Sequence, residues 1–325
     1  MGVKNRVKAD RRNIAKAAAV IRAGGVVAFP TETVYGLGAD GLNPEACARV
    51  FEIKGRPRFD PLILHAASAA GARKLFRRVP AGAAKLMKKF WPGPLTLVLP
   101  KAAAVPDIVT AGLDTVAVRV PSCRTALALI KAAGRPIAAP SANRFGRLSP
   151  VTAAHVGKQL GSAPDLILDG GRTRIGVEST IVAFSGGRPV LLRPGGTPLE
   201  EIEKAAGKAA APAGGGKAPA APGCLKSHYA PAARLRLVRA GSRVTPSRGA
   251  AYLAFSRRPA PGFKAAGVLS PSGDLREAAA NLFHELHRLE RSGAPLIYAE
   301  IVPARGLGRA IMDRLRRAAA AKGKK

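Results

Sequence analysis

The chain has 325 residues, of which 47% are hydrophobic and 22% charged, enough to bury one large core or two smaller ones. No stretch approaches the ~18 apolar residues of a membrane span, and the apolar run near the start is broken at Arg22, too early for an export signal. The 53 basic and 20 acidic side chains give a formal net charge of +33, which attracts phosphate groups but does not distinguish a nucleotide from tRNA or another anionic surface. We therefore expect a globular, cytosolic protein with no membrane partner.

The first part of the chain alternates helical patterns with short apolar runs, which favours a sheet covered by helices. A helix is predicted at residues 13–23 and a strand at residues 26–29, because two glycines separate the two patterns. Asn43 is a good N-cap for a helix that begins with Pro44 and reaches about Lys54. Further strands are predicted at residues 62–64, 95–99, 116–120, 137–139, 166–168, 180–183 and 190–192. Together these strands predict a mixed sheet.

A long segment with almost no bulky apolar side chain follows at residues 204–223, KAAGKAAAPAGGGKAPAAPG. It cannot bury enough surface to offset the entropy of ordering, so we interpret it as a flexible linker. Beyond it the patterns predict strands at residues 251–255 and 296–301 and amphipathic helices at residues 274–291 and 307–320. The predicted organisation is a first domain over residues 1–203, a linker over residues 204–230 and a smaller α/β domain over residues 231–325.

Familiar nucleotide and metal motifs are absent or misplaced. GLGADG at residues 36–41 has the spelling of a dinucleotide-binding turn, but the helix begins only at Asn43. We interpret these glycines as a tight chain reversal. No P-loop sequence occurs. His284 and His287 lack the spacing of a zinc protease, so we expect them on the surface.

Three cysteines, Cys47, Cys123 and Cys224, are odd in number and widely spaced. They form neither a disulfide framework nor a metal-binding pair, so we interpret them as reduced and not catalytic. We expect no metal site built by the protein.

Polar and cationic residues cluster just outside the apolar runs, where α/β sheets usually place ligand sites. Lys54 and Arg56 lie two apart in an extended loop, so they point to one side and suit a pair of cations that grips a polyphosphate. Singly, each cluster could also be a structural cap or a surface charge. The clusters are PTET at residues 30–33, KGRP at 54–57, His65, Arg119, PSAN at 140–143, GVEST at 176–180 and RPG at 193–195.

Taken together, these segments resemble the L-threonylcarbamoyladenylate synthase (YrdC-like) family in its long, two-domain form. The similar stretches follow the family's order and cover nearly the whole first domain. They are FPTETVYGLGAD at residues 29–40, KGRPRFDPLILH at 54–65, FWPGPLTLVLP at 90–100, TVAVRVP at 115–121, APSANRFGRLSP at 139–150, GVESTIV at 176–182 and LLRPG at 191–195. HYAP at residues 228–231 and GLGRAIMDRL at residues 306–315 resemble the extra domain of the long form.

The resemblance implies an open twisted mixed sheet with a deep basic cavity, plus a smaller C-terminal α/β domain on a flexible linker. The implied reaction joins the amine of L-threonine to bicarbonate as a carbamate, which attacks the α-phosphorus of ATP and expels pyrophosphate. Magnesium is expected on the ATP phosphates. The product would pass to a downstream tRNA threonylcarbamoyltransferase, and direct contact with tRNA stays open.

The family's functional residues carry over position by position. As the resemblance implies, Lys54 and Arg56 would be the catalytic cations on the phosphates. L-threonine would be held by Thr33, His65, Arg119, Ala139 and Ser179, and ATP by Arg56, Asp60, Thr115, Ser141, Asn143, Ser149, Arg193 and Tyr229. Such an inventory of cations and hydroxyls is adequate for nucleotidyl transfer, which needs positioning and neutralised charge and no covalent nucleophile.

Three positions depart from the family's pattern. Asp60 stands where many relatives have Asn, which adds a negative charge near the nucleotide unless a metal ion or Lys54 offsets it. Cys123 replaces a common His, and Cys224 replaces a common Met. These departures bear on local contacts and leave the assignment unchanged.

Two other functions fit parts of the sequence. The same fold module occurs in hydrogenase-maturation carbamoyltransferases, but those carry acylphosphatase and zinc-finger regions for which this chain lacks the length and the paired cysteines. A non-enzymatic RNA-binding module would explain the charge, but the ten Phe, four Tyr and one Trp form no cluster for stacking bases. Pyrophosphate release that depends on threonine and bicarbonate would separate an enzyme from a binder.

Overall fold

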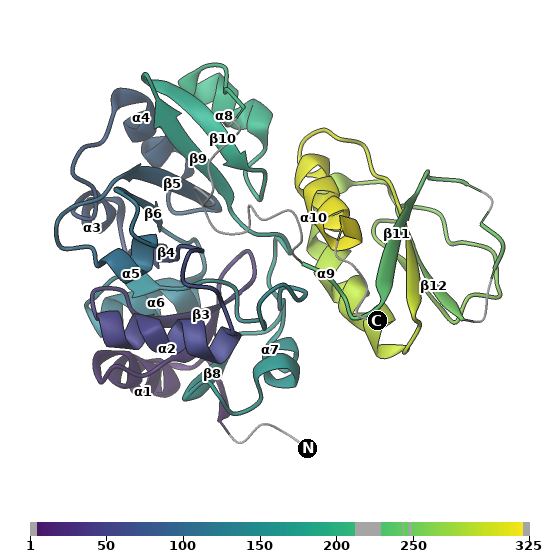
Figure 1. Cartoon of the computed structure of the whole chain (residues 1–325), viewed down its shortest axis with the longest axis horizontal. Coiled ribbons are helices and arrows are strands. Elements are labelled where there is room, and N and C mark those ends of the chain that lie inside the picture. The colour runs from purple at the N-terminus through teal and green to yellow at the C-terminus, as the bar shows by residue number, and fades with distance from the viewer. Residues whose placement is uncertain (1–4, 212–228, 243, 247–248, 321–325) are drawn as a thin grey trace.

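The computed structural model describes residues 5–211, 229–242, 244–246 and 249–320. Within these ranges the chain forms one ten-stranded and one four-stranded sheet, each accompanied by helices (Figure 1). The prediction of a large mixed sheet with a smaller C-terminal α/β domain is therefore confirmed. Among the helices of these ranges, none is both long and apolar enough to cross a membrane.

The large sheet has the strand order β1-β8-β2-β3-β7-β4-β6-β5-β9-β10 and mixes parallel with antiparallel pairs. Its strands are β1 (Arg6–Lys8), β2 (Val27–Pro30), β3 (Tyr35–Asp40), β4 (Ile63–His65), β5 (Leu95–Pro100), β6 (Thr115–Arg119), β7 (Ile137–Ala138), β8 (Leu166–Asp169), β9 (Thr180–Ser185) and β10 (Arg188–Arg193). Its helices are α1 (Arg11–Arg22), α2 (Pro44–Lys54), α3 (Ala69–Arg73), α4 (Ala81–Phe90), α5 (Asp107–Thr110), α6 (Arg124–Ala133), α7 (Ala153–Leu160) and α8 (Leu199–Ala206).

Helix α2 forms as its local sequence predicts. The Asn43 side chain accepts hydrogen bonds from the backbone N–H groups of Glu45 and Ala46, which the first turn leaves without helical partners. Gly55 ends the helix in the left-handed region at φ 59°, a conformation that glycine adopts without a Cβ penalty. The polar loop that carries Arg56 therefore begins at a fixed point.

Strand β3 corrects the interpretation of GLGADG as a chain reversal. Gly36 and Gly38 lie in extended backbone that pairs antiparallel with β2. A Cβ on Gly38 would lie 2.6 Å from the Phe29 ring and 2.6 Å from the Ile137 side chain. Gly36 and Gly38 are therefore required for close packing between neighbouring strands, and the interpretation was wrong for these two glycines, whereas Gly41 does lie in a turn.

The two faces of the large sheet are covered unequally at β4, β6, β5 and β9. One face packs against α3, α4 and α8 through a large apolar cluster. The opposite face carries a small cluster of buried apolar side chains, Ile63, Val98, Ala117 and Ile181. The polar residues of the candidate site lie on and around this second face.

The second domain is a parallel sheet with two helices on one side. Its strands are β11 (Arg234–Val238), β12 (Ala250–Ala254), β13 (Ala265–Val268) and β14 (Leu296–Glu300), in the order β11-β14-β12-β13, and its helices are α9 (Leu275–Arg291) and α10 (Gly308–Ala320). Figure 1 shows α9 and α10 between the two sheets. Val34, Leu148, Val151 and Val177 of the first domain share one apolar cluster with these helices. The two domains therefore have a common core at their boundary.

Two histidines meet at this boundary. The rings of His155 on α7 and His287 on α9 have centroids 3.9 Å apart, and His287 Nε2 lies 3.1 Å from the Ser149 carbonyl oxygen. The expected surface position of His287 was wrong, because this face of α9 packs on the first domain and leaves the residue 3% exposed. Burial lowers the pKa of His155 to about 3 and that of His287 to about 4.

The first residues of the predicted linker belong to the folded first domain. Lys204 lies within α8, because alanine and lysine are good helix formers. Ala210 pairs with the edge strand β10, where its N–H donates to the Pro189 carbonyl oxygen at 2.9 Å. Residues 212–228, which hold most of the predicted linker and Cys224, lie outside the described residues.

The buried interface histidines should make stability depend on pH. Below pH ~6.5 the unfolded chain takes up a proton at each histidine, whereas folded His287 resists protonation down to about pH 4. Stability is therefore lost as the pH falls through this window, by about 2 kcal/mol for His287 between pH 7 and pH 5. Urea denaturation at pH 7 and at pH 5 measures this loss. Between these two pH values, the free energy of unfolding of His287→Gln should fall by about 2 kcal/mol less than that of the wild type.

His284→Gln on the same helix is the matched control, because His284 is only half-buried. It should leave most of the pH dependence in place. A His287→Gln protein with the pH dependence of the wild type would contradict this account of the interface.

Candidate active site

A polar pocket lies over the less covered face of the large sheet. Its volume of about 40 Å³ is well below the ~300–1,000 Å³ of usual small-molecule sites, so ATP cannot enter without movement of the surrounding side chains. The depth of the implied cavity stays a prediction. The pocket is lined by Thr31, Thr33, Val34, Gly36, Arg56, Ile63, His65, Arg119, Ala139, Pro140, Ser141, Glu178, Ser179, Arg193 and Tyr229.

All five residues expected to hold L-threonine line this pocket: Thr33, His65, Arg119, Ala139 and Ser179. They come from five segments of the sheet, and the register of the strands brings them together. β4 and β6 are parallel neighbours in which His65 lies opposite Arg119. Segments far apart in the sequence thus converge on a space the size of a few atoms.

The residues expected to hold ATP divide into two groups. Arg56, Ser141, Arg193 and Tyr229 line the pocket. Asp60, Thr115, Asn143 and Ser149 do not line it, and neither does Lys54, the other expected catalytic cation.

Lys54 and Asn143 support the loop that carries Ser141. Lys54 Nζ donates to the carbonyl oxygens of Ser141 at 2.6 Å and Asn143 at 2.5 Å. Burial and the charge of Arg56 lower the pKa of Lys54 well below its ordinary value. The Asn143 amide donates to the carbonyl oxygens of Arg144 and Arg147. Lys54 therefore fixes this loop through its backbone.

The Asp60 carboxylate forms a buried ion pair with Arg56, with Oδ1 2.9 Å from Nη2. Arg56 also donates through Nε to the Asp60 carbonyl oxygen and through Nη2 to that of Pro61, at 2.9 and 2.7 Å. Burial raises the pKa of Asp60, although Arg56, Lys54 and Arg193 oppose the shift. The negative charge of Asp60 is thus held against Arg56.

Thr115 lies farther along the same face of the sheet. It is four residues from Arg119 on β6, so the two side chains point to the same side of the strand, roughly 13 Å apart. A ligand that extends from the pocket along β6 would reach it.

A second buried ion pair holds Arg119, and sequence reasoning did not assign its partner. Arg119 Nη2 lies 2.7 Å from Glu32 Oε1, while Nη1 donates to Thr33 Oγ1 at 2.9 Å and Nε to the Gly93 carbonyl oxygen at 3.1 Å. Burial works to raise the pKa of Glu32, but Arg119 holds it below its ordinary value. The sequence did contain a signal for this pair. Glu32 closely follows a buried strand, and a buried carboxylate requires a cation near it.

His65 is neutral in this site. Burial first and Arg119 second lower its pKa to about 3. Its Nδ1 lies 3.2 Å from the Ile63 carbonyl oxygen, a contact that requires Nδ1 to carry the proton, so Nε2 is left as an acceptor. The imidazole can therefore accept a hydrogen bond from a substrate hydroxyl or ammonium group.

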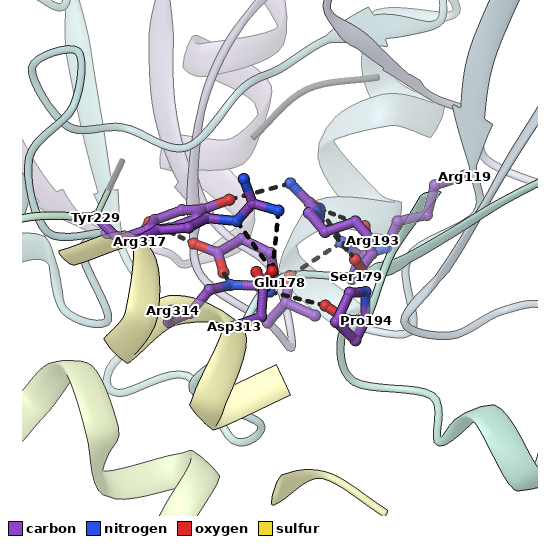
Figure 2. A network of polar contacts seen from close by, with 11 residues as sticks. Arg119, Glu178, Ser179, Arg193, Pro194, Tyr229, Asp313, Arg314 and Arg317 are labelled. Carbon is purple, nitrogen blue, oxygen red and sulfur yellow. Dashed lines mark hydrogen bonds and ion pairs between the residues drawn. The ribbon is translucent and has the colours of Figure 1, made fainter. Parts of the chain in front are cut away.

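Glu178 lines the pocket and is a second carboxylate that sequence reasoning did not assign. Its Oε1 accepts a hydrogen bond from Ser149 Oγ at 2.5 Å, and its Oε2 lies 2.7 Å from Arg314 Nε of helix α10 (Figure 2). The expected ATP residue Ser149 is thus held just behind the pocket wall. Because Arg314 belongs to the other domain, only the folded structure reveals this pair.

The carboxylates around the pocket are poor candidates for a metal site. Glu32, Asp60 and Glu178 each form an ion pair with an arginine. Over the part of the chain that the structure describes, no group of three or more His, Cys, Asp or Glu side chains could hold a metal ion. Cys47 is buried, and burial raises its pKa to about 12, which disfavours the reactive thiolate.

Sequence profiles identify the family. A profile described as telomere recombination matches residues 19–195. A second, described as the C-terminal domain of threonylcarbamoyl-AMP synthase, matches residues 197–320. The chain belongs to the Sua5/YciO/YrdC family, in the form that carries both domains.

Its relatives agree over nearly the whole chain. The threonylcarbamoyl-AMP synthase of Pyrococcus abyssi is 47% identical over 327 residues, which cover 96% of each chain. That of Bacillus subtilis is 43% identical over 94% of this chain and 92% of its own. The crystal structure of P. abyssi Sua5 complexed with L-threonine matches with a TM-score of 0.88 and 43% identity, over 97% of this chain and 96% of that one. The resemblance of the motifs is therefore confirmed.

Removing the Glu32 charge should destabilise the protein strongly. Glu32→Gln leaves Arg119 buried without its counter-charge, which costs about 3–5 kcal/mol. Glu200→Gln is the matched control, because it breaks an ion pair with Arg309 whose side chains are 48% and 42% exposed, and exposed pairs contribute about 0–1 kcal/mol. Urea denaturation measures both changes. Equal losses of unfolding free energy in the two variants would show that the buried ion pair contributes no more to stability than the exposed one.

Proposed function

We propose that this chain is a threonylcarbamoyl-AMP synthase, which makes threonylcarbamoyl-AMP and pyrophosphate from L-threonine, bicarbonate and ATP. The observation that carries the proposal is the convergence of Thr33, His65, Arg119, Ala139 and Ser179 on one pocket beside Arg56 and Arg193. The names of relatives up to 47% identical over nearly the full chain support it.

The reaction has two bond-forming steps. The neutral amine of threonine attacks the carbon of bicarbonate, and loss of water leaves a carbamate. A carbamate oxygen then attacks the α-phosphorus of ATP, and the bond to pyrophosphate breaks. Both steps bring anions together, so the site must bind several negative charges at once.

The pocket residues suit these requirements. Arg119 has N–H groups beyond its three described contacts, which can hold the threonine carboxylate beside the Thr33 hydroxyl. Neutral His65 does not repel the amino group and can accept a hydrogen bond from it or from the substrate hydroxyl. Arg56 and Arg193 would neutralise the phosphates, while Lys54 holds the loop that carries Ser141, another pocket residue.

Magnesium would enter with ATP. Mg²⁺ usually binds one or two carboxylates together with substrate phosphates, but the three carboxylates beside the pocket are already paired with arginines. The chain's own residues therefore fit a protein-held magnesium poorly, and we assign no step to the ion.

The product is a mixed anhydride that water destroys, so a second enzyme must use it promptly. We propose that this consumer is a tRNA threonylcarbamoyltransferase and that both act in the cytosol. The net charge of +33 would also allow direct contact with tRNA. Retention of labelled product in the presence of tRNA would test that contact.

Arg56 should be essential for catalysis. Asp60→Asn serves as the background, because it removes the carboxylate that Arg56→Ala would otherwise leave buried and unpaired. Arg56→Ala in this background should slow formation of threonylcarbamoyl-AMP from ¹⁴C-bicarbonate by at least ~100-fold, about 2.7 kcal/mol of transition-state stabilisation.

Arg58→Ala, in an exposed position of the same loop, is the control and should retain activity. Wild-type product that forms without added threonine or bicarbonate would refute the proposed function. Near-normal turnover of a folded Arg56→Ala/Asp60→Asn protein would refute the role of Arg56.

A further inference from the structure

The motif GLGRAIMDRL at residues 306–315 leads into helix α10 and includes Arg314, which does not line the pocket. This side chain is 1% exposed although it belongs to the second domain. Nε donates to Glu178 Oε2 at 2.7 Å, and Nη1 donates to the Pro194 carbonyl oxygen at 2.8 Å. Figure 2 shows Glu178 at the centre of a network that joins α10 to Ser179 and Arg193. Arg314 therefore crosses the domain boundary to reach the back of the site.

Arg314 pairs with the Glu178 carboxylate and holds its orientation. A carboxylate buried beside a triphosphate site would repel the nucleotide unless a cation neutralised it. Although burial opposes the shift, Glu178, Tyr229 and Asp313 raise the pKa of Arg314, so its charge is permanent. The same carboxylate accepts the hydrogen bond of Ser149, so Arg314 also fixes that hydroxyl indirectly.

Arg314 also contacts Tyr229, which lines the pocket. Its guanidinium carbon lies 5.0 Å from the centre of the Tyr229 ring, and Arg193 Nη1 donates to the Tyr229 hydroxyl at 3.4 Å. Tyr229 has φ 62°, a left-handed conformation that costs a bulky residue about 1–3 kcal/mol. Arginines of both domains thus hold a strained residue in the pocket wall.

Stability alone explains this network poorly. Buried ion pairs often contribute less than apolar side chains of the same volume. Arg314 Nη2 is buried and, within the described ranges, has no hydrogen-bond partner, which adds a further cost. The interface already has an apolar core and the exposed Arg309–Glu200 ion pair. The network therefore indicates a role in the site.

We propose that Arg314 is a positioning residue of the active site, an inference that rests on the function proposed above. Docked α10 holds Glu178 and Tyr229 in the arrangement that ATP requires, so ATP binding depends on the contact between the domains. Arg314 makes its hydrogen bonds to Glu178, Pro194 and Asp313 and none, among described residues, to the side chains expected to hold threonine. ATP affinity should therefore respond to Arg314 more than threonine affinity.

A double-mutant cycle on the full chain tests this coupling. Arg314→Met should raise the Kd of α,β-methylene-ATP, measured by calorimetry, by about tenfold or more, with the Kd of L-threonine within about twofold of the wild type. Glu178→Gln in the same protein removes the uncompensated carboxylate and should restore at least about threefold of that loss. If Arg314 had a purely structural role, the losses of ATP affinity caused by Arg314→Met and by Glu178→Gln would instead be additive.

Arg309→Met is the matched control, since it removes another interdomain ion pair of α10 away from the pocket and should leave both Kd values unchanged. If Arg314→Met does not fold by circular dichroism, Arg314→Gln replaces it in the cycle, because glutamine also removes the charge but keeps an N–H donor for Glu178. Additive losses, a parallel rise of both Kd values, or an equal effect of Arg309→Met would overturn the proposal. Calorimetry needs no turnover, so these results are independent of the adenylate assay.

Discussion

The site depends on charged side chains that are buried together beside one face of the large sheet. Five are cationic, namely Lys54, Arg56, Arg119, Arg193 and Arg314, and three are carboxylates, namely Glu32, Asp60 and Glu178, and none is more than 7% exposed. Burying an unpaired charge costs several kcal/mol, so each carboxylate lies against an arginine.

This requirement explains why two domains share one site. The face of β4, β6, β5 and β9 that bears the pocket carries only a small apolar cluster, so polar side chains can gather there. Glu178 would be an unpaired charge on that face if the first domain stood alone, and helix α10 supplies the arginine. The boundary that allows this contact also buries His155 and His287 in their neutral form. Docking, charge neutralisation and response to pH are therefore connected.

Local sequence predicted those features that depend on near neighbours. Asn43 and Pro44 begin a helix because the cap and the first turn are adjacent in the chain. The motif segments also identified all five residues that gather as the expected threonine set. The glycines of β3 were misinterpreted, because their role depends on Phe29 and Ile137, which only the folded sheet brings near.

Long-range charge pairs could not be predicted in the same way. Glu178 and Arg314 are 136 residues apart, and no local pattern shows which of 53 basic side chains a given carboxylate will meet. The surface position predicted for His287 was wrong for the same reason. The periodicity of α9 shows that one face of the helix is buried, but it does not show which domain covers that face.

A crystal structure of the full chain with L-threonine and α,β-methylene-ATP would test the account most directly. It should place the threonine carboxylate within hydrogen-bond distance of Arg119 and the triphosphate against Arg56 and Arg193, with the Arg314–Glu178 pair intact beside them. Ligand density away from this pocket, or a triphosphate bound while Arg314 has separated from Glu178, would contradict it.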